Sequence, residues 1–150
     1  MRRLEREQHL PGEPDEVFPF FADALNLERI TPPWLGFRVT TPGTIEMGPG
    51  TLIEYRLRLH RVPVRWLTRI EVWEPPERFV DTQVRGPYRV WRHEHRFAPA
   101  PGGGALMRDR VDYELPLGPL GDLAHALIVR RDLARIFDHR HSAVAAYFTK

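Results

Sequence analysis

Residues 88–97 read YRVWRHEHRF, an alternation of charged residues with aromatic residues and histidines. Successive side chains of a β-strand point to opposite faces, so the alternation predicts a strand with one charged and one largely aromatic face. The aromatic face carries Trp91, His93, His95 and Phe97, and the opposite face carries Arg92, Glu94 and Arg96. We expect the charged face to point to solvent, because the other parity would bury three charges.

The neighbouring stretches repeat this pattern and predict a sheet. Strands are expected over residues 51–59, 65–74, 78–84 and 105–115, with Pro75-Pro76, Gly86-Pro87 and the loop 99–104 as turns. Their apolar faces are expected to carry Ile53, Tyr55, Leu57, Leu59, Trp66, Thr68, Ile70, Val72, Met107, Val111 and Tyr113. Strands of this kind, joined by short turns, form an antiparallel meander with one solvated side.

The two ends of the chain are predicted to add a first strand over residues 2–10 and several helices. Asp15 is the expected N-cap of a helix whose apolar face carries Val17, Phe18, Phe20, Phe21, Ala24 and Leu25. A second short helix over 25–30 is expected to end at Pro32-Pro33. A long helix is predicted from a cap at Asp122 to Phe148, about 40 Å at ~1.5 Å per residue.

The apolar stripe of this long helix is predicted from residues at helical spacing: Leu123, Leu127, Ile136, Phe137, Val144, Tyr147 and Phe148. Arg130, Arg131, Arg135 and Arg140 are expected to face outward or to flank the stripe. The order of elements predicts an α+β fold in which a curved antiparallel sheet wraps around the C-terminal helix, with two short helices after the first strand.

Composition narrows the function classes. The 150 residues contain no cysteine, which excludes disulfides, thiolate metal sites and cysteine nucleophiles. All but Lys150 of the 22 basic residues are arginines, yet 20 acidic residues leave a net charge of +2. Because the two signs alternate, the pattern does not favour nucleic-acid binding. No stretch is long and apolar enough for a membrane span or signal peptide, so we expect one cytoplasmic domain over residues 1–150.

Several motifs resemble the START-like, or SRPBCC, superfamily, which includes polyketide cyclase/dehydrase-like and Bet v 1-type proteins. They are YRLR at 55–58, VPVRW at 62–66, WEPPERFVDTQ at 73–83, GPY at 86–88, WRHEH at 91–95 and IFDHR at 136–140. They are similar to one ligand-binding subfamily and span nearly the whole chain. The resemblance implies a helix-grip fold in which the concave sheet face and the long helix enclose a cavity.

Strand parity predicts the lining of that cavity. The expected ligand-binding residues are Tyr55, Trp66, Thr68, Phe79, Asp81, Gln83, Trp91, His93, His95, Asp109, Tyr113 and Phe137. Aromatic walls with a few polar groups are typical of a small-molecule pocket. Trp34 and Leu35 are expected near the cavity mouth, where they could form a lid.

His93 and His95 are the main catalytic candidates, together with Asp81 and Asp109. Their i, i+2 spacing puts both histidines on one face of the strand, ~6–7 Å apart along the chain. They could simply bond polar neighbours, act as a carboxylate-oriented general base, or, with one carboxylate, bind a metal. Since no third metal ligand is fixed, we predict no metal and no cofactor. Gln83 could bond a ligand or complete the histidine network.

These observations favour binding of a small hydrophobic or aromatic ligand, with or without transport. One alternative is an enzyme of cyclase, aromatase or dehydratase type that uses a cavity histidine as general acid or base. Another is a protein-interaction module. The predicted partner is thus a small hydrophobic ligand. We expect neither nucleic-acid binding nor a membrane span, and a homodimer is a possible oligomeric state.

Overall fold

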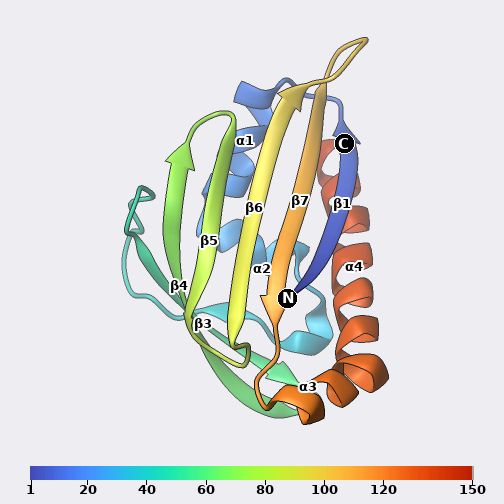
Figure 1. The fold of residues 1–150 in the computed structure, drawn as a ribbon. Coiled ribbons are helices and arrows are strands. Elements are labelled where there is room, and N and C mark those ends of the chain that lie inside the picture. Colours follow the sequence, from blue (N-terminus) through green and yellow to red (C-terminus); the bar gives the residue numbers. More distant parts are fainter. Residues whose placement is uncertain (150) are drawn as a thin grey trace.

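A seven-stranded antiparallel sheet organises the part of the chain that the computed structural model describes, residues 1–149. Its strands are β1 Arg2–Leu10, β2 Arg38–Val39, β3 Leu52–Leu59, β4 Val62–Glu74, β5 Arg78–Arg85, β6 Val90–Pro99 and β7 Ala105–Glu114. The strand order is β1-β7-β6-β5-β4-β3-β2, a meander that β1 joins through β7. Figure 1 shows α1 and α2 behind the strands and α4 along the β1 edge.

The helices confirm the predicted α+β architecture. They are α1 Pro14–Ala22, η1 Ala24–Asn26, α2 Leu27–Ile30, η2 Pro33–Leu35, α3 Gly118–Ala124, η3 His125–Val129 and α4 Arg130–Phe148. The last three follow one another without a break and form the long C-terminal helix. No helix within residues 1–149 is both long and apolar enough to cross a membrane.

Both predicted helix caps are wrong by a few residues. Glu13, not Asp15, is the N-cap of α1, because Pro14 occupies the first helical position, where its missing N–H costs nothing. The long helix begins at Gly118 rather than after Asp122, directly behind Leu117, whose φ is 72°. Pro119 lies in its first turn.

The predicted apolar stripe of the long helix is correct only in its second half. Leu133, Phe137 and Val144 are buried, whereas Leu123 and Leu127 are 57% and 66% exposed. The cause is η3, a π-helical segment with more residues per turn than an α-helix. It rotates the preceding turns, so that Gly121 and His125 face inward instead. Leu25 and Tyr147, also predicted on apolar faces, are exposed too.

A register shift in β4 corrects the predicted facing at the end of that strand. The pairing with β5 is irregular between Ile70 and Val72, so the strict alternation breaks there. As a result Trp73, not Val72, joins the aromatic core, with its ring 5.4 Å from Phe18 and 5.7 Å from Phe79.

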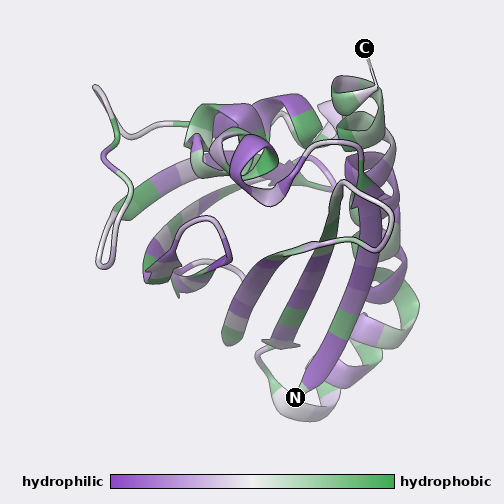
Figure 2. Ribbon diagram, turned by 90° about the horizontal axis from the view of Figure 1, so that it is seen from above, coloured by the Kyte–Doolittle hydropathy of each residue, from purple (hydrophilic) through white to green (hydrophobic). Residues whose placement is uncertain are grey.

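Three hydrophobic clusters fill the space between the sheet and the helices. The first joins α1 to β5–β7 and Val144, the second joins β3 and β4 to Ala24, and the third joins β7 to Leu133 and Phe137 of α4. Figure 2 shows the alternation of hydrophilic and hydrophobic residues along the strands that makes this one-sided burial possible.

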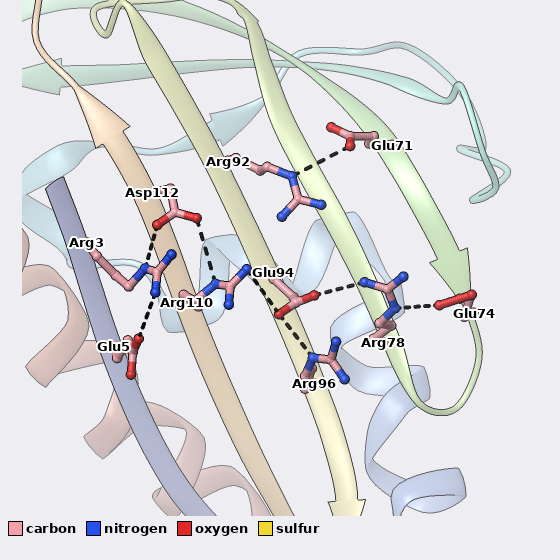
Figure 3. Close-up of polar contacts among 10 residues, drawn as sticks. All are labelled: Arg3, Glu5, Glu71, Glu74, Arg78, Arg92, Glu94, Arg96, Arg110 and Asp112. Carbon is pink, nitrogen blue, oxygen red and sulfur yellow. Dashed lines mark hydrogen bonds and ion pairs between the residues drawn. The ribbon is translucent and has the colours of Figure 1, made fainter. Parts of the chain in front are cut away.

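The opposite face of the sheet carries ion pairs, and one of its acidic residues is buried. Glu94 was expected to point to solvent, but it is only 5% exposed, because arginines cover it (Figure 3). Arg78 donates to Glu94 at 2.9 Å, and Arg96 Nε lies 3.0 Å from its other carboxylate oxygen. Burial raises the pKa of Glu94, but these two guanidinium groups outweigh it and the net shift is downward.

Candidate functional site

A cavity of about 170 Å³ lies where the three hydrophobic clusters meet, partly open to solvent. Its wall comes from β3–β6, α2, α4 and the segment around η2. The lining residues are Leu27, Ile30, Thr31, Leu35, Phe37, Tyr55, Leu57, Leu59, Trp66, Thr68, Asp81, Tyr88, Trp91, His93, His95, Leu133, Ile136, Phe137 and Arg140. Aliphatic and aromatic side chains dominate, and the carboxylate, imidazole and guanidinium groups come from β5, β6 and α4.

Most residues predicted to line a cavity do so. Tyr55, Trp66, Thr68, Asp81, Trp91, His93, His95 and Phe137 are among the lining residues. Leu35 joins them, whereas Trp34 is 51% exposed and lies under the guanidinium of Arg135, 4.9 Å from its ring centre.

Four predicted lining residues have other positions. Phe79 lies behind His95, with the two rings stacked 4.0 Å apart. Gln83 bonds the backbone N–H and C=O of Tyr88 and so fixes the turn between β5 and β6. The hydroxyl of Tyr113 lies 2.7 Å from His125 Nε2. Asp109 sits behind the histidines as their hydrogen-bond partner. Parity places all four on the inner face, but neighbouring side chains separate them from the cavity.

Asp109 is the centre of a buried polar cluster. Its Oδ1 atom accepts from His93 Nε2 at 2.8 Å and from Arg140 Nη2 at 3.3 Å, and lies 3.3 Å from His95 Nδ1. Burial opposes ionisation of Asp109, but Arg140 and the histidines more than offset it and hold its pKa well below the ordinary value. Asp109 is therefore an anion at neutral pH, and it can only accept hydrogen bonds.

The two histidines respond oppositely to this environment. Burial alone would lower the pKa of His95, but its contacts with Asp109 and Asp81 raise the pKa above the ordinary value. The Asp81 contact is a hydrogen bond of 2.7 Å. Burial lowers the pKa of His93, and the charge of His95 lowers it further. His93 is thus neutral at pH 7, with its proton on Nε2, because Asp109 accepts there.

Arg140 was not among the predicted site residues, because it was expected to face outward or to flank the apolar stripe. Arg140 is only 8% exposed and reaches from α4 into the cluster. A signal was present: Leu133, Phe137, Arg140 and Val144 are spaced by four, three and four residues, which puts them on one helix face. An arginine on a buried face requires a buried acid, and Asp109 is that acid.

Three buried polar atoms of the lining residues have no hydrogen-bond partner among residues 1–149: Trp66 Nε1, Thr68 Oγ1 and Arg140 Nε. Buried polar groups in proteins are usually paired, so unpaired ones around a cavity indicate where a ligand would bond. Burial, together with the charge of Asp81, raises the pKa of Tyr55 and outweighs the opposing effect of the nearby Thr68 hydroxyl, which keeps that cavity phenol neutral.

A metal fits this arrangement poorly. Asp81, His93 and His95 can bring ligand atoms within 4.8 Å of one another. However, the Asp81 and His95 atoms bond each other, and the Arg140 guanidinium lies 3.4 Å from His95 Nδ1. A cation would have to replace these bonds beside an existing positive charge. The donor set favours the closed ion-pair network over metal ligation.

A curved antiparallel sheet around a long helix, with a cavity between them, defines a helix-grip protein. Solved structures share it over nearly their whole length, at identities that indicate the fold alone. Protein CV1439 from Chromobacterium violaceum matches with a TM-score of 0.76 at 16% identity, covering 100% of this chain and 99% of that one. A START superfamily protein from Mycobacterium smegmatis has a TM-score of 0.68 at 11% identity, with coverages of 98% and 97%.

The structure of Ara h 8.0201 is also similar, with a TM-score of 0.69 at 17% identity, covering 99% of this chain and 97% of that one. A comparison with curated protein sequences finds no match. The sequence model of the family described as "Polyketide cyclase / dehydrase and lipid transport" matches residues 1–149. The chain belongs to this family, as the resemblance of its motifs predicted.

Proposed function

We propose that the protein binds a small hydrophobic or aromatic ligand in its internal cavity. The cavity carries this proposal: about 170 Å³ of space lined mainly by apolar side chains, with a few polar groups among them. Small-molecule sites commonly combine such an apolar wall with few polar groups that orient the ligand. Membership of a family described by cyclase, dehydrase and lipid-transport activities agrees with a ligand cavity.

Calorimetric titration with ethylbenzene tests this proposal. Leu57 lines the cavity and is 8% exposed, so Leu57→Trp should fill the space and abolish binding. Leu52 on the same strand is 48% exposed, so Leu52→Trp should bind like the wild type. Thermal unfolding verifies that both variants fold, since overpacking a core costs about 1–3 kcal/mol. Unchanged binding by folded Leu57→Trp would refute the cavity as the ligand site.

A second candidate function, proton transfer to or from the ligand, rests on His93. Its one hydrogen bond within the range 1–149 joins Nε2 to Asp109, so Nδ1 is not engaged there. This is the arrangement of a general base: a carboxylate orients a neutral imidazole at one nitrogen, and the lone pair of the other nitrogen is free to accept a proton. His95 is less suited to this role because its contacts with Asp81 and Asp109 raise its pKa and so favour its protonated form.

Deuterium exchange of the acetophenone methyl protons tests for a base in the cavity. In that reaction His93 Nδ1 would take a proton from carbon, the C–H electron pair would form the enolate, and solvent would return a deuteron. The rate, followed by proton NMR in D2O, should exceed the buffer rate and fall to it in His93→Gln. His141→Gln, an exposed change on α4, is the control. A wild-type rate equal to that of buffer would contradict the role.

A further inference from the structure

The unpartnered polar atoms of the cavity share one chemical property. Trp66 Nε1 and Arg140 Nε can only donate a hydrogen bond, and the Thr68 hydroxyl can donate as well. Thr68 is 1% exposed and Arg140 is 8% exposed, so bulk water cannot satisfy them freely. A ligand that pairs with these atoms must therefore bring hydrogen-bond acceptors rather than donors.

The charge of the neighbouring cluster indicates what kind of acceptor fits. Asp81 and Asp109 contact the Arg140 guanidinium and the His95 imidazole, whose protonated form these carboxylates favour, while His93 is neutral. The two carboxylates of the cluster are thus already paired with cationic or protonatable groups of the protein. An anionic ligand would add an uncompensated charge beside two carboxylates, which is costly in a buried site. A carbonyl oxygen accepts hydrogen bonds without adding charge.

The size of the cavity limits the ligand further. The space is about 170 Å³. An engineered protein cavity of about 150 Å³ holds one benzene molecule. One ring with a short substituent is therefore the size that the cavity encloses, and an extended lipid chain is too large to be enclosed.

We propose that the cavity recognises a neutral one-ring compound that carries a carbonyl oxygen, which accepts from donors among Trp66, Thr68 and Arg140. This inference rests on the proposed binding function and names the ligand class of that same site. It distinguishes the ligand from a plain hydrocarbon, from a carboxylate and from a long-chain lipid.

Calorimetry with three probes of matched size tests the inference: acetophenone, ethylbenzene and benzoate. Acetophenone should bind more tightly than the other two. Thr68→Val keeps the side-chain shape. It should lower the affinity for acetophenone about three- to tenfold, as expected for one lost neutral hydrogen bond, and leave the affinity for ethylbenzene unchanged. Thr82→Val is the matched control, because Thr82 follows the cavity-lining Asp81 on β5 and its side chain points to the other face.

Two results would overturn the inference while leaving the binding function intact. The first is equal affinity of the wild type for acetophenone and ethylbenzene, and the second is tighter binding of benzoate than of acetophenone. Equal weakening of both neutral probes by Thr68→Val would also overturn it, because the hydroxyl would then act through the shape of the cavity. Absence of binding by all three probes would instead refute the proposed function itself.

Discussion

The imidazole rings of His93 and His95 stack with their centres 3.7 Å apart and their planes at 26°, yet their pKa values shift in opposite directions. Two cationic rings at this distance would repel each other strongly. The two carboxylates favour protonation of one ring over the other. His95 contacts both Asp81 and Asp109, whereas His93 contacts only Asp109. One ring holds the charge, and the other is thereby kept neutral.

NMR titration of the two imidazoles should reveal this division. The pKa of His95 is raised and that of His93 is lowered, so at pH 7 His95 should be cationic and His93 neutral with its proton on Nε2. Nitrogen shifts distinguish these states directly. Asp81→Asn should lower the pKa of His95, because it removes one of the two carboxylates that raise it. A titration in which His93 protonates before His95 would contradict the assignment.

The long helix should contribute stability through one face only. Phe137 is 5% exposed and packs in the cluster with Val111, Tyr113 and Leu133, so Phe137→Ala should cost about 3–5 kcal/mol of unfolding free energy. Leu127 is 66% exposed, so Leu127→Ala should cost less than about 0.5 kcal/mol. Denaturant unfolding measures both. A similar loss in the two variants would mean that η3 does not turn Leu127 away from the core.

The buried glutamate of the outer face should matter more than its exposed neighbours. Glu94→Gln weakens charge-assisted bonds from Arg78 and Arg96, and we expect a loss of about 1–3 kcal/mol. Glu71→Gln is the control, because Glu71 is 46% exposed at its side chain and has one contact of 3.6 Å with Arg92. Its loss should be below about 1 kcal/mol. Chemical denaturation with urea, which adds no salt, measures the unfolding free energy of both variants. Equal losses would show that burial of Glu94 adds nothing to the strength of its ion pairs.

Much of the fold could be predicted from residues 88–97 and their neighbours, because period-two alternation determines the facing of each strand wherever the pairing is regular. The pairing of β6 with β7 is regular from Val90 to Pro99, and there His93 and His95 face inward as expected. The irregular pairing in β4 has no comparable sequence signal. For this reason Val72, and not Trp73, was predicted on the inner face of the sheet.

The predictions about charged residues failed for a common reason. Glu94 and Arg140 were expected to face outward or flank a face because each, taken alone, is costly to bury. Both are buried with partners from other elements: Arg78 and Arg96 cover Glu94, and Asp109 pairs with Arg140. Such pairings depend on tertiary contacts between strands or between helix and sheet, which the pattern of a single element does not contain. The π-helical segment η3 likewise altered facing without an evident local signal.

The central claim, that the cavity is a ligand site, is tested most directly by the indole N–H signals of the four tryptophans. Trp66 and Trp91 line the cavity, while Trp34 and Trp73 do not. In proton–nitrogen NMR spectra, titration with ethylbenzene should shift the signals of Trp66 and Trp91 in a saturable manner and leave those of Trp34 and Trp73 in place. Saturable shifts confined to Trp34 or Trp73, or no shift in any of the four, would contradict the claim.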